Sequence, residues 1–398
     1  MANNNGFKRG LRRTKNKVID FVSTKGKQNL IVVAALAVLV VVFWALNPNF
    51  LRTTNIVSMA QSLAPYAILA LGVTFVIATG GIDLSIGTVC IASAVIAGKL
   101  YVPVEQGGWG MIPLWATIPV MIIIGTIFGF INGILVAKLK LPAFIATLGT
   151  MMFSRGISAI IATVPNIFFP SGTWFNKTFS NANGIPTGLF WILGFALVCM
   201  YLMYKCKIGR YILSIGSNEE ATRLSGINVD KYKVIAYTFS GVAAGIAAIF
   251  WAASFPTVAA ATGNGMELDA IAGVYIGGTS SAGGTASIAG SVIGNIMLVV
   301  IRSGLNFVLA KFDLNLNSTY VTYALTGLIV VAAVLMDVIK NRNAAKVKIE
   351  TEKEAQKRIR KQALADLEDE IDAVLASPFT KEEKIAQVAL LEEKISKL

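Results

Sequence analysis

Residues 205–233 read KCKIGRYILSIGSNEEATRLSGINVDKYK, and apolar runs long enough to cross a bilayer lie on both sides of them. Ser217 and Glu220 have the S-x-x-E spacing of a capping box, which predicts a helix that starts at Asn218 with its first amides bonded to those two side chains. Gly226 ends this helix, because glycine accepts the left-handed conformation that stops one. We therefore expect a short helix between two membrane spans at the cytosolic surface, where a partner that moved it would move both spans.

The composition of the chain is typical of a polytopic membrane protein. Of its 398 residues, 55% are apolar and only 14% are charged. Repeated apolar runs near the ~20 residues needed to cross the hydrocarbon predict an all-α fold, because helices satisfy their own backbone in lipid. The net charge of +13 comes largely from basic residues that flank apolar runs. These set topology and meet anionic lipid headgroups, so we do not expect nucleic acid as a partner.

The residue types that are missing exclude several kinds of chemistry. The chain has no histidine, which removes HExxH zinc sites, Ser-His and Cys-His nucleophile pairs, and histidine proton relays. Its three cysteines form no CxxC pair, so neither a disulfide framework nor a metal site is expected. There is no G-x-x-x-x-G-K-[ST] loop to hold ATP phosphates. The sequence thus predicts no catalytic residue, metal or cofactor, and any ATP would be bound by another subunit.

The apolar runs predict about ten crossings, some by discontinuous helices, with both ends of the chain in the cytosol. Residues 1–29 form a basic N-terminus with eight lysines and arginines, which should stay inside. The transmembrane domain is expected over 30–340. Its crossings are placed at 30–46, 63–98 (two), 113–136, 143–161, 188–204, 234–253, 270–301 (two) and 320–339. The external loops then carry only Arg52, Lys99, Lys177, Arg302 and Lys311.

The run 63–98 must be broken, because one helix of this length would extend about 54 Å and the hydrocarbon core is only ~30 Å thick. Gly80 and Gly81 mark the break, with Asp83 or Ser85 expected to cap the returning helix. An aspartate at the bilayer centre would cost about 2.5 to 3.5 kcal/mol. We therefore expect this turn at the interface or in a water-filled cavity.

A second glycine-rich bend divides the uncharged run 270–301. Its candidate path residues are Gly277, Gly278, Thr279, Gly283 and Gly284. Their amides and hydroxyl could line a substrate path, although close helix packing explains the glycines equally well. Asn132 is a further candidate, beside a stripe formed by Gly125, Gly129 and Gly133 that would allow another helix to approach.

After residue 341 the membrane pattern stops. A charged segment with apolar residues at helical spacing runs to about residue 376, and Ser377-Pro378 breaks it. Thr380 and Glu383 make another capping box before a second apolar stripe, which contains Ile385, Val388, Leu391, Ile395 and Leu398. The pattern predicts a cytosolic helical hairpin over 341–398.

Five ordered motifs connect these features with a known family. They are GGIDLSIG at 80–87, PAFIATLGT at 142–150, GSNEEA at 216–221 with SGI at 225–227, ELDAIA at 267–272, and GGTSSAGG at 277–284. Together they resemble the permease subunits of bacterial ABC sugar importers of the ribose and galactoside type, over about residues 47–337. The tail beyond about residue 344 departs from that family. The resemblance implies a multi-pass protein of the cytoplasmic membrane, a second permease copy, a cytosolic ATPase and an external sugar-binding protein.

The resemblance also implies roles for particular residues. The predicted inner-face helix would couple to the ATPase through Ser217, Asn218, Glu219, Glu220, Ala221, Arg223 and Gly226. Glu267 and Asp269, expected outside, would dock the binding protein or simply be solvated. For Gly80, Gly81, Asp83 and Ser85 we favour a structural turn over direct contact with sugar.

The expected function is to form the path for a monosaccharide, driven by a separate ATPase. A neutral sugar needs hydroxyls, amides and aromatic faces, and the spans offer few ionisable groups. The same architecture carrying branched-chain amino acids or nucleosides is the nearest alternative, and Arg155, inside a span, keeps it open. An ion-driven transporter is disfavoured by the lack of intramembrane carboxylates beyond Asp83, and a membrane hydrolase by the lack of a nucleophile-base pair.

Overall fold

The computed structural model describes residues 32–162, 166–255, 257–260, 262–311 and 318–378, together with residues 30, 380–382, 387, 389–391 and 394. This part of the chain is almost entirely helical. Its two strands, β1 (Ile167–Phe168) and β2 (Thr257–Val258), pair antiparallel with Ile167 opposite Val258. The all-α prediction is confirmed for the described residues. The basic segment 1–29 and the positions Glu383, Ile385, Val388, Ile395 and Leu398 lie outside them.

The chain divides into two compact units, Met1–Asp337 and Val338–Leu398. The described helices of the first unit, apart from single turns, are Val32–Leu46, α2 (Thr53–Ala78), α3 (Ile86–Tyr101), α4 (Thr117–Gly133), α5 (Ala143–Ala162), α6 (Trp174–Phe179), α7 (Gly188–Tyr204), α8 (Lys207–Ser217), α9 (Glu219–Leu224), α10 (Val229–Ser254), α11 (Met266–Ile276) and α12 (Ile288–Lys311). A further helix, α13 (Ser318–Ala376), begins in this unit and continues into the second.

Five of the described helices are long and apolar enough to cross a membrane: α2, α4 with its flanking turns (Leu114–Lys138), α5, α10 and α12. The pair α7 and α8, bent by 66°, could form a sixth span. Val32–Leu46, α3 and Ala324–Met336 are apolar but shorter. The molecule is therefore a polytopic helical membrane protein, and the number of ten crossings stays a prediction.

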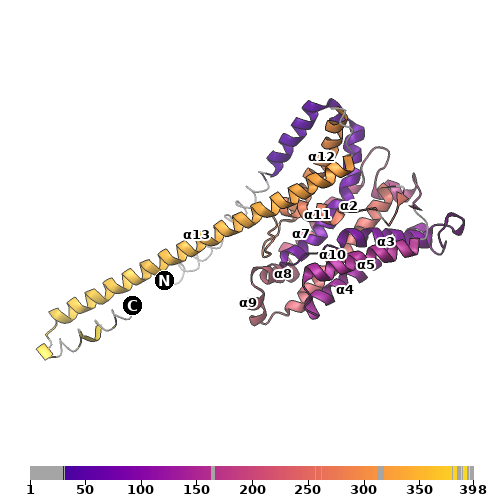
Figure 1. Cartoon of the computed structure of the whole chain (residues 1–398). Helices are drawn as coiled ribbons and strands as arrows, with labels where there is room; N and C mark the ends of the chain where they lie inside the picture. The colour runs from indigo at the N-terminus through magenta and orange to yellow at the C-terminus, as the bar shows by residue number, and fades with distance from the viewer. Residues whose placement is uncertain are drawn as a thin grey trace, which may run out of the picture. The chain divides into compact units, whose positions relative to one another are not determined.

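The core lies where α2 and α10 pack together, with α4 against the other side of α10 (Figure 1). The predicted small-residue stripe of α4 faces a second one on α10. A Cβ added at Gly125 would lie 2.6 Å from the Gly245 nitrogen, and one at Gly129 would lie 2.7 Å from the Gly241 Cα. The two helices thus touch backbone to backbone, which is how helices that lack a hydrophobic driving force between them gain contact in lipid.

Two local features differ from the expectations. α2 begins at Thr53, ten residues before the predicted span, and continues through Pro65. The polar stretch after α7 contains α8, which the sequence analysis did not anticipate. Gly209 of α8 lies directly against the Met203 backbone, and only a residue without a side chain allows the chain to turn back so sharply.

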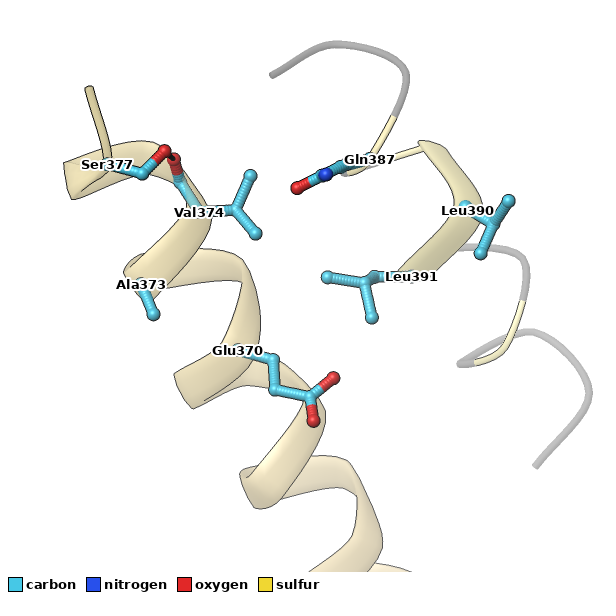
Figure 2. Close-up of a pocket in the computed structure, with 7 residues that line it drawn as sticks. All are labelled: Glu370, Ala373, Val374, Ser377, Gln387, Leu390 and Leu391. Carbon is cyan, nitrogen blue, oxygen red and sulfur yellow. Dashed lines mark hydrogen bonds between the residues drawn. The ribbon is translucent and has the colours of Figure 1, made fainter. Parts of the chain in front are cut away.

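In the second unit, α13 ends at Ala376 and the break at Ser377-Pro378 is confirmed. Beyond it, Leu391 is buried and points toward the helix that carries Glu370 and Val374 (Figure 2). A groove between the two segments is lined by Glu370, Ala373, Val374, Ser377, Gln387, Leu390 and Leu391. The complete hairpin stays a prediction, because much of its second arm is outside the described residues.

Candidate functional site

The predicted inner-face helix is α9, and its N-cap is Asn218. The Asn218 Oδ1 accepts a 2.9 Å hydrogen bond from the Ala221 amide. The predicted capping box is wrong, because Ser217 is the last residue of α8 and its hydroxyl donates to the Leu213 carbonyl instead. Gly226 has a φ of 81°, which confirms the left-handed residue expected after the helix.

A chain of ion pairs holds α9 against its neighbours. Lys233 of α10 contacts Glu219 at 2.6 Å, and Glu219 contacts Arg223 at 3.2 Å. Arg223 in turn contacts Asp230 at 3.2 Å, and Asp230 contacts Lys140, in the turn before α5, at 2.6 Å. No local pattern in the sequence pointed to Lys140, Asp230 and Lys233, because their pairing depends on how the loops fold. We call these five residues the ion-pair chain.

The ion-pair chain keeps its two carboxylates charged. Partial burial of Glu219 opposes its ionisation, but the hydrogen bond and charge of Lys233, with those of Arg223, outweigh it and lower the pKa of Glu219. The hydrogen bond from Lys140, assisted by Arg223, lowers the pKa of Asp230. Each exposed pair contributes little by itself. Together they tie α9 to α10 and to the turn before α5.

The opposite side of α9 is free within the first unit. Glu220 and Ala221 are exposed, and Leu224 exposes 84% of its surface. A large apolar side chain so exposed on a polar surface is typical of an interaction site. Leu224 was not among the predicted coupling residues, although it lies three residues after Ala221 and so shares its helix face.

Two glycine-rich turns that are far apart in sequence meet at the end of α8. The Gly284 amide donates a 3.0 Å hydrogen bond to the carbonyl of Ala78, the last residue of α2. A Cβ added at Gly283 would lie 2.6 Å from the Gly80 nitrogen and 3.0 Å from the Gly216 Cα. Gly80, Gly283 and Gly284 all have positive φ. We call this contact of Ala78, Gly80, Gly216, Gly283 and Gly284 the glycine joint.

The remaining residues of the second bend shape the connection between α11 and α12. A Cβ added at Gly277 would lie 2.6 Å from the Ser291 nitrogen, and Gly278 has a φ of 88°. The Thr279 hydroxyl accepts a 3.1 Å hydrogen bond from the Ser287 amide. Close packing therefore accounts for Gly277 and the left-handed backbone for Gly278, and the Thr279 hydroxyl is engaged within the bend.

The turn between α2 and α3 directs Asp83 into a buried polar network. Asp83 Oδ1 accepts hydrogen bonds from the amide and the hydroxyl of Ser85, at 3.0 and 2.7 Å, and its Oδ2 accepts one from Ser240 at 2.8 Å. Asn132 donates to the Ser85 hydroxyl at 2.8 Å and accepts from Thr150 at 2.6 Å. The network links α3, α4, α5 and α10, and its bonds satisfy polar groups that would be costly to bury alone.

This network corrects one expectation about the turn. Ser85 occupies the N-cap position of α3, as one of the two expectations had it, but its side chain makes no capping hydrogen bond to the helix. The Asp83 carboxylate binds the hydroxyls of Ser85 and Ser240 instead. Gly81 lies against the Tyr237 hydroxyl, which donates a 3.2 Å hydrogen bond to the Ile82 carbonyl.

Glu267 and Asp269 do not lie exposed in an external loop as expected. Both belong to the first turn of α11, and each exposes only 6% of its surface. Asp269 is paired with Arg302, which is not in an external loop either but inside α12, with its guanidinium 5.0 Å from the centre of the Tyr66 ring. A buried aspartate needs such a partner. Buried side chains cannot dock a binding protein, so that assignment loses its premise.

No group of three histidine, cysteine, aspartate or glutamate residues is placed to hold a metal ion in the part of the chain that the structure describes. The candidate features in the described part of the chain are the exposed face of α9, the ion-pair chain, the glycine joint and the buried polar network. They run in this order from the polar surface into the helical core.

Comparisons with known proteins match most of the chain. The family described as branched-chain amino acid transport system / permease component matches residues 55–334. The ribose import permease protein RbsC of Escherichia coli (strain K12) is 35% identical over 310 residues, which are 76% of this chain and 91% of that protein. The D-allose transport system permease protein AlsC of the same strain is 32% identical over 303 residues, covering 76% and 89%. The L-arabinose transport system permease protein AraH is 30% identical over 313 residues, covering 79% and 90%. No solved structure matches significantly.

Proposed function

The chain belongs to the branched-chain amino acid transport system / permease component family, and from this premise we propose that it forms the membrane path by which an ATP-driven importer takes up a monosaccharide. Family membership confirms the resemblance drawn from the five motifs. The substrate class is inferred from the relatives: permeases named for ribose, allose and arabinose align with this chain over about nine tenths of their own length.

The exposed face of α9 is the proposed docking point for a separate cytosolic ATPase. Leu224, flanked by Glu220 and Ala221, offers an apolar side chain to a groove on that partner. Because the ion-pair chain ties α9 to α10 and to the turn before α5, a push on α9 would reach both helices. This is a two-state mechanical input of the kind that transporters need.

The glycine joint would carry the same movement into the core. Gly216 is two residues before the Asn218 cap, and it touches both glycine-rich turns. One of these turns leads directly to Asp83. We assign Gly80, Gly81, Asp83, Ser85 and Asn132 to holding the helices in register, because the Asp83 carboxylate accepts three hydrogen bonds from protein donors. Gly277, Gly278 and Thr279 have the same structural role in the second bend.

We also propose an assembly and a membrane topology, which rest on the positions of the basic residues and on the family resemblance. Both termini and α9 face the cytosol, with residues 1–29 as a basic end, 30–340 as a ten-crossing permease domain and 341–398 as a cytosolic hairpin. A second permease copy and lipid would cover the apolar side chains that α5 and α7 expose, such as Phe153, Ile160 and Phe190. An external sugar-binding protein would deliver the substrate to this complex in the bacterial cytoplasmic membrane.

A branched-chain amino acid is the second candidate substrate. The description of the family names this class, and Arg155 places a cation inside α5 that could bind a carboxylate. The sugar permeases among the relatives favour the monosaccharide. The direct test is uptake of radiolabelled ribose, allose, arabinose and leucine into proteoliposomes that hold the permease, its ATPase and its binding protein, with ATP inside.

The coupling assignment is tested in the same proteoliposomes. Leu224→Glu should abolish both sugar uptake and the stimulation of ATP hydrolysis by the binding protein, since a charge would enter the apolar contact. Val104→Glu is the matched control, because Val104 is also an exposed apolar residue but lies far from α9 in the sequence. Full activity of Leu224→Glu, or uptake driven by an ion gradient without ATP, would overturn the proposal.

A further inference from the structure

Two of the short helices begin against each other inside the protein. A Cβ added at Gly87, in the first turn of α3, would lie 2.5 Å from Glu267 Oε2, 2.8 Å from the Glu267 nitrogen and 3.0 Å from the Met266 Cβ. Met266 is the first residue of α11. The N-termini of α3 and α11 therefore meet, each with the positive end of its dipole. Discontinuous helices that meet in this way form the substrate sites of many transporters.

Glu267 is the exception among the buried carboxylates of this region. Asp83 accepts three hydrogen bonds, and Asp269 is paired with Arg302. Glu267 is 6% exposed, and the backbone amides of Gly265 and Glu267 donate to its carboxyl group, but no donor among the described residues reaches its buried Oε2 atom. A buried acceptor without a partner is costly, so such an atom points to a ligand that supplies the hydrogen bond at some stage of the cycle.

The surroundings of Glu267 suit a polar, uncharged ligand. Thr88, next to Gly87, accepts a 2.8 Å hydrogen bond from Ser154 of α5, which brings the hydroxyls of both helices to the same level. The adjacent Arg155 carries a positive charge that acts on the Glu267 carboxylate, but no ion pair joins them in the described structure. The charges of the Arg155 guanidinium and the Glu267 carboxylate cancel, and both groups form strong hydrogen bonds with hydroxyl groups.

This cluster lies near the middle of a span. Arg155 is the thirteenth of the twenty residues of α5 (Ala143–Ala162), so it is about 18 Å from one end of a helix that is about 30 Å long. An ionisable residue at such a depth is expected to serve function, because its burial is otherwise unfavourable. The position also agrees with substrate sites near the bilayer midplane.

We propose that Glu267 contacts the transported sugar: its Oε2 accepts a hydrogen bond from one sugar hydroxyl, with Arg155 facing the same ligand from α5. Gly87 lets the backbone of α3 lie directly against the carboxylate, because no side chain stands between them. The assignment rests on the proposed function, since it names a contact within that path. Contact with a substrate inside the protein is compatible with the burial of Glu267 at the start of α11, whereas docking a partner at the surface is not.

The test uses the complete complex in proteoliposomes, with uptake of D-ribose and of its monodeoxy analogues and with ATP hydrolysis measured in parallel. Glu267→Gln keeps the size of the side chain but replaces a charged acceptor with a neutral amide. We expect ribose uptake to fall about tenfold while stimulated ATP hydrolysis persists. For each sugar, uptake by Glu267→Gln is divided by uptake by the wild-type permease, so that the sugar preference of the binding protein cancels. This ratio should fall least for the analogue that lacks the contacted hydroxyl.

Gly87→Ser is a second variant, because a side chain there would press on the Glu267 carboxylate, displace it and so reduce uptake. Glu105→Gln, on an exposed turn, is the control for loss of a carboxylate and should transport normally. Copurification with the ATPase checks that each variant assembles. Normal ribose uptake by Glu267→Gln, or an equal loss for every deoxy analogue, would overturn the inference. If the wild-type complex imports leucine but no sugar, the proposed function itself is wrong.

Discussion

The Gly284 amide donates a 3.0 Å hydrogen bond to the Ala78 carbonyl, and this bond joins the end of α2 to the bend between α11 and α12. Gly216 closes the contact from a third side, at the end of α8. Backbone touches backbone with no side chain between, so the three segments cannot slide past one another without opening a void. A displacement of α9 should therefore reach the core as a rigid movement.

Substitution of Gly216 should uncouple the movement of α9 from the movement of the core helices. A valine there would be driven into the Ala78 carbonyl and the Gly284 amide, which are backbone atoms that cannot simply move aside. We expect Gly216→Val to retain at least partial ATP hydrolysis in the assembled complex but to lose most sugar uptake. Gly149→Ala is the control, because its Cβ would meet no atom within 4 Å. Normal uptake by Gly216→Val would contradict transmission through the glycine joint.

The buried polar network should be a major source of stability. Asp83→Ala removes three hydrogen bonds and leaves the hydroxyls of Ser85 and Ser240 without their acceptor. We expect a loss of about 2 to 4 kcal/mol in the free energy of unfolding, seen as a lower melting temperature in detergent. Ser214→Ala, which removes only a bond to the Arg210 carbonyl at an exposed position of α8, should be nearly neutral. Equal melting temperatures for the two variants would refute this role.

The buried ion pair of Asp269 and Arg302 should contribute to the stability of the protein, and a double variant can check this. Asp269→Ala leaves the buried guanidinium without its partner, which typically costs about 3 to 5 kcal/mol. The double variant Asp269→Leu, Arg302→Met removes both charges and should recover most of the melting temperature. If Asp269→Ala is instead as stable as the wild-type protein and only binds the sugar-binding protein less tightly, the docking role would have to be restored.

Low pH should break the ion pairs that hold α9 against α10 and the turn before α5. The folded-state pKa values of Glu219 and Asp230 lie below those of the unfolded chain, which are about 4. Their ion pairs thus contribute fully at higher pH, and this stability is lost as pH falls through the folded-state values. A spin label on Glu220→Cys, with Cys206 replaced by serine, should show unchanged mobility from pH 7 to 5 and greater mobility below about pH 4.

Removing a cation from the ion-pair chain should move that transition. Without Lys233, burial of Glu219 is opposed by Arg223 alone, so the pKa of Glu219 should rise. Lys233→Met should therefore release the label at a higher pH than the wild-type permease. Lys231→Met, which removes a neighbouring lysine outside the ion-pair chain, should leave the transition in place. Identical profiles for both variants would show that Lys233 does not hold α9.

Local signals were sufficient for most of the helices and for the glycine breaks, although not for α8. Apolar run lengths placed a helix at each expected span, and Gly80 and Gly226 adopt the left-handed conformation that their positions required. Predictions from sequence were wrong where the local pattern around a residue fits two structural roles. Ser217 matches a capping box but ends α8, and Glu267 resembles an exposed loop residue but enters α11.

The sequence by itself determined that this chain crosses the membrane as helices and where those helices break, because run length and glycine position are properties of a single segment. Only the tertiary structure decided that the breaks at Gly80 and Gly284 meet, that Asp269 finds Arg302, and that Glu267 Oε2 has no donor among the described residues. The physical reason is that helices in lipid are apolar on nearly every side. Their sequences then carry little information about which neighbour each one packs against.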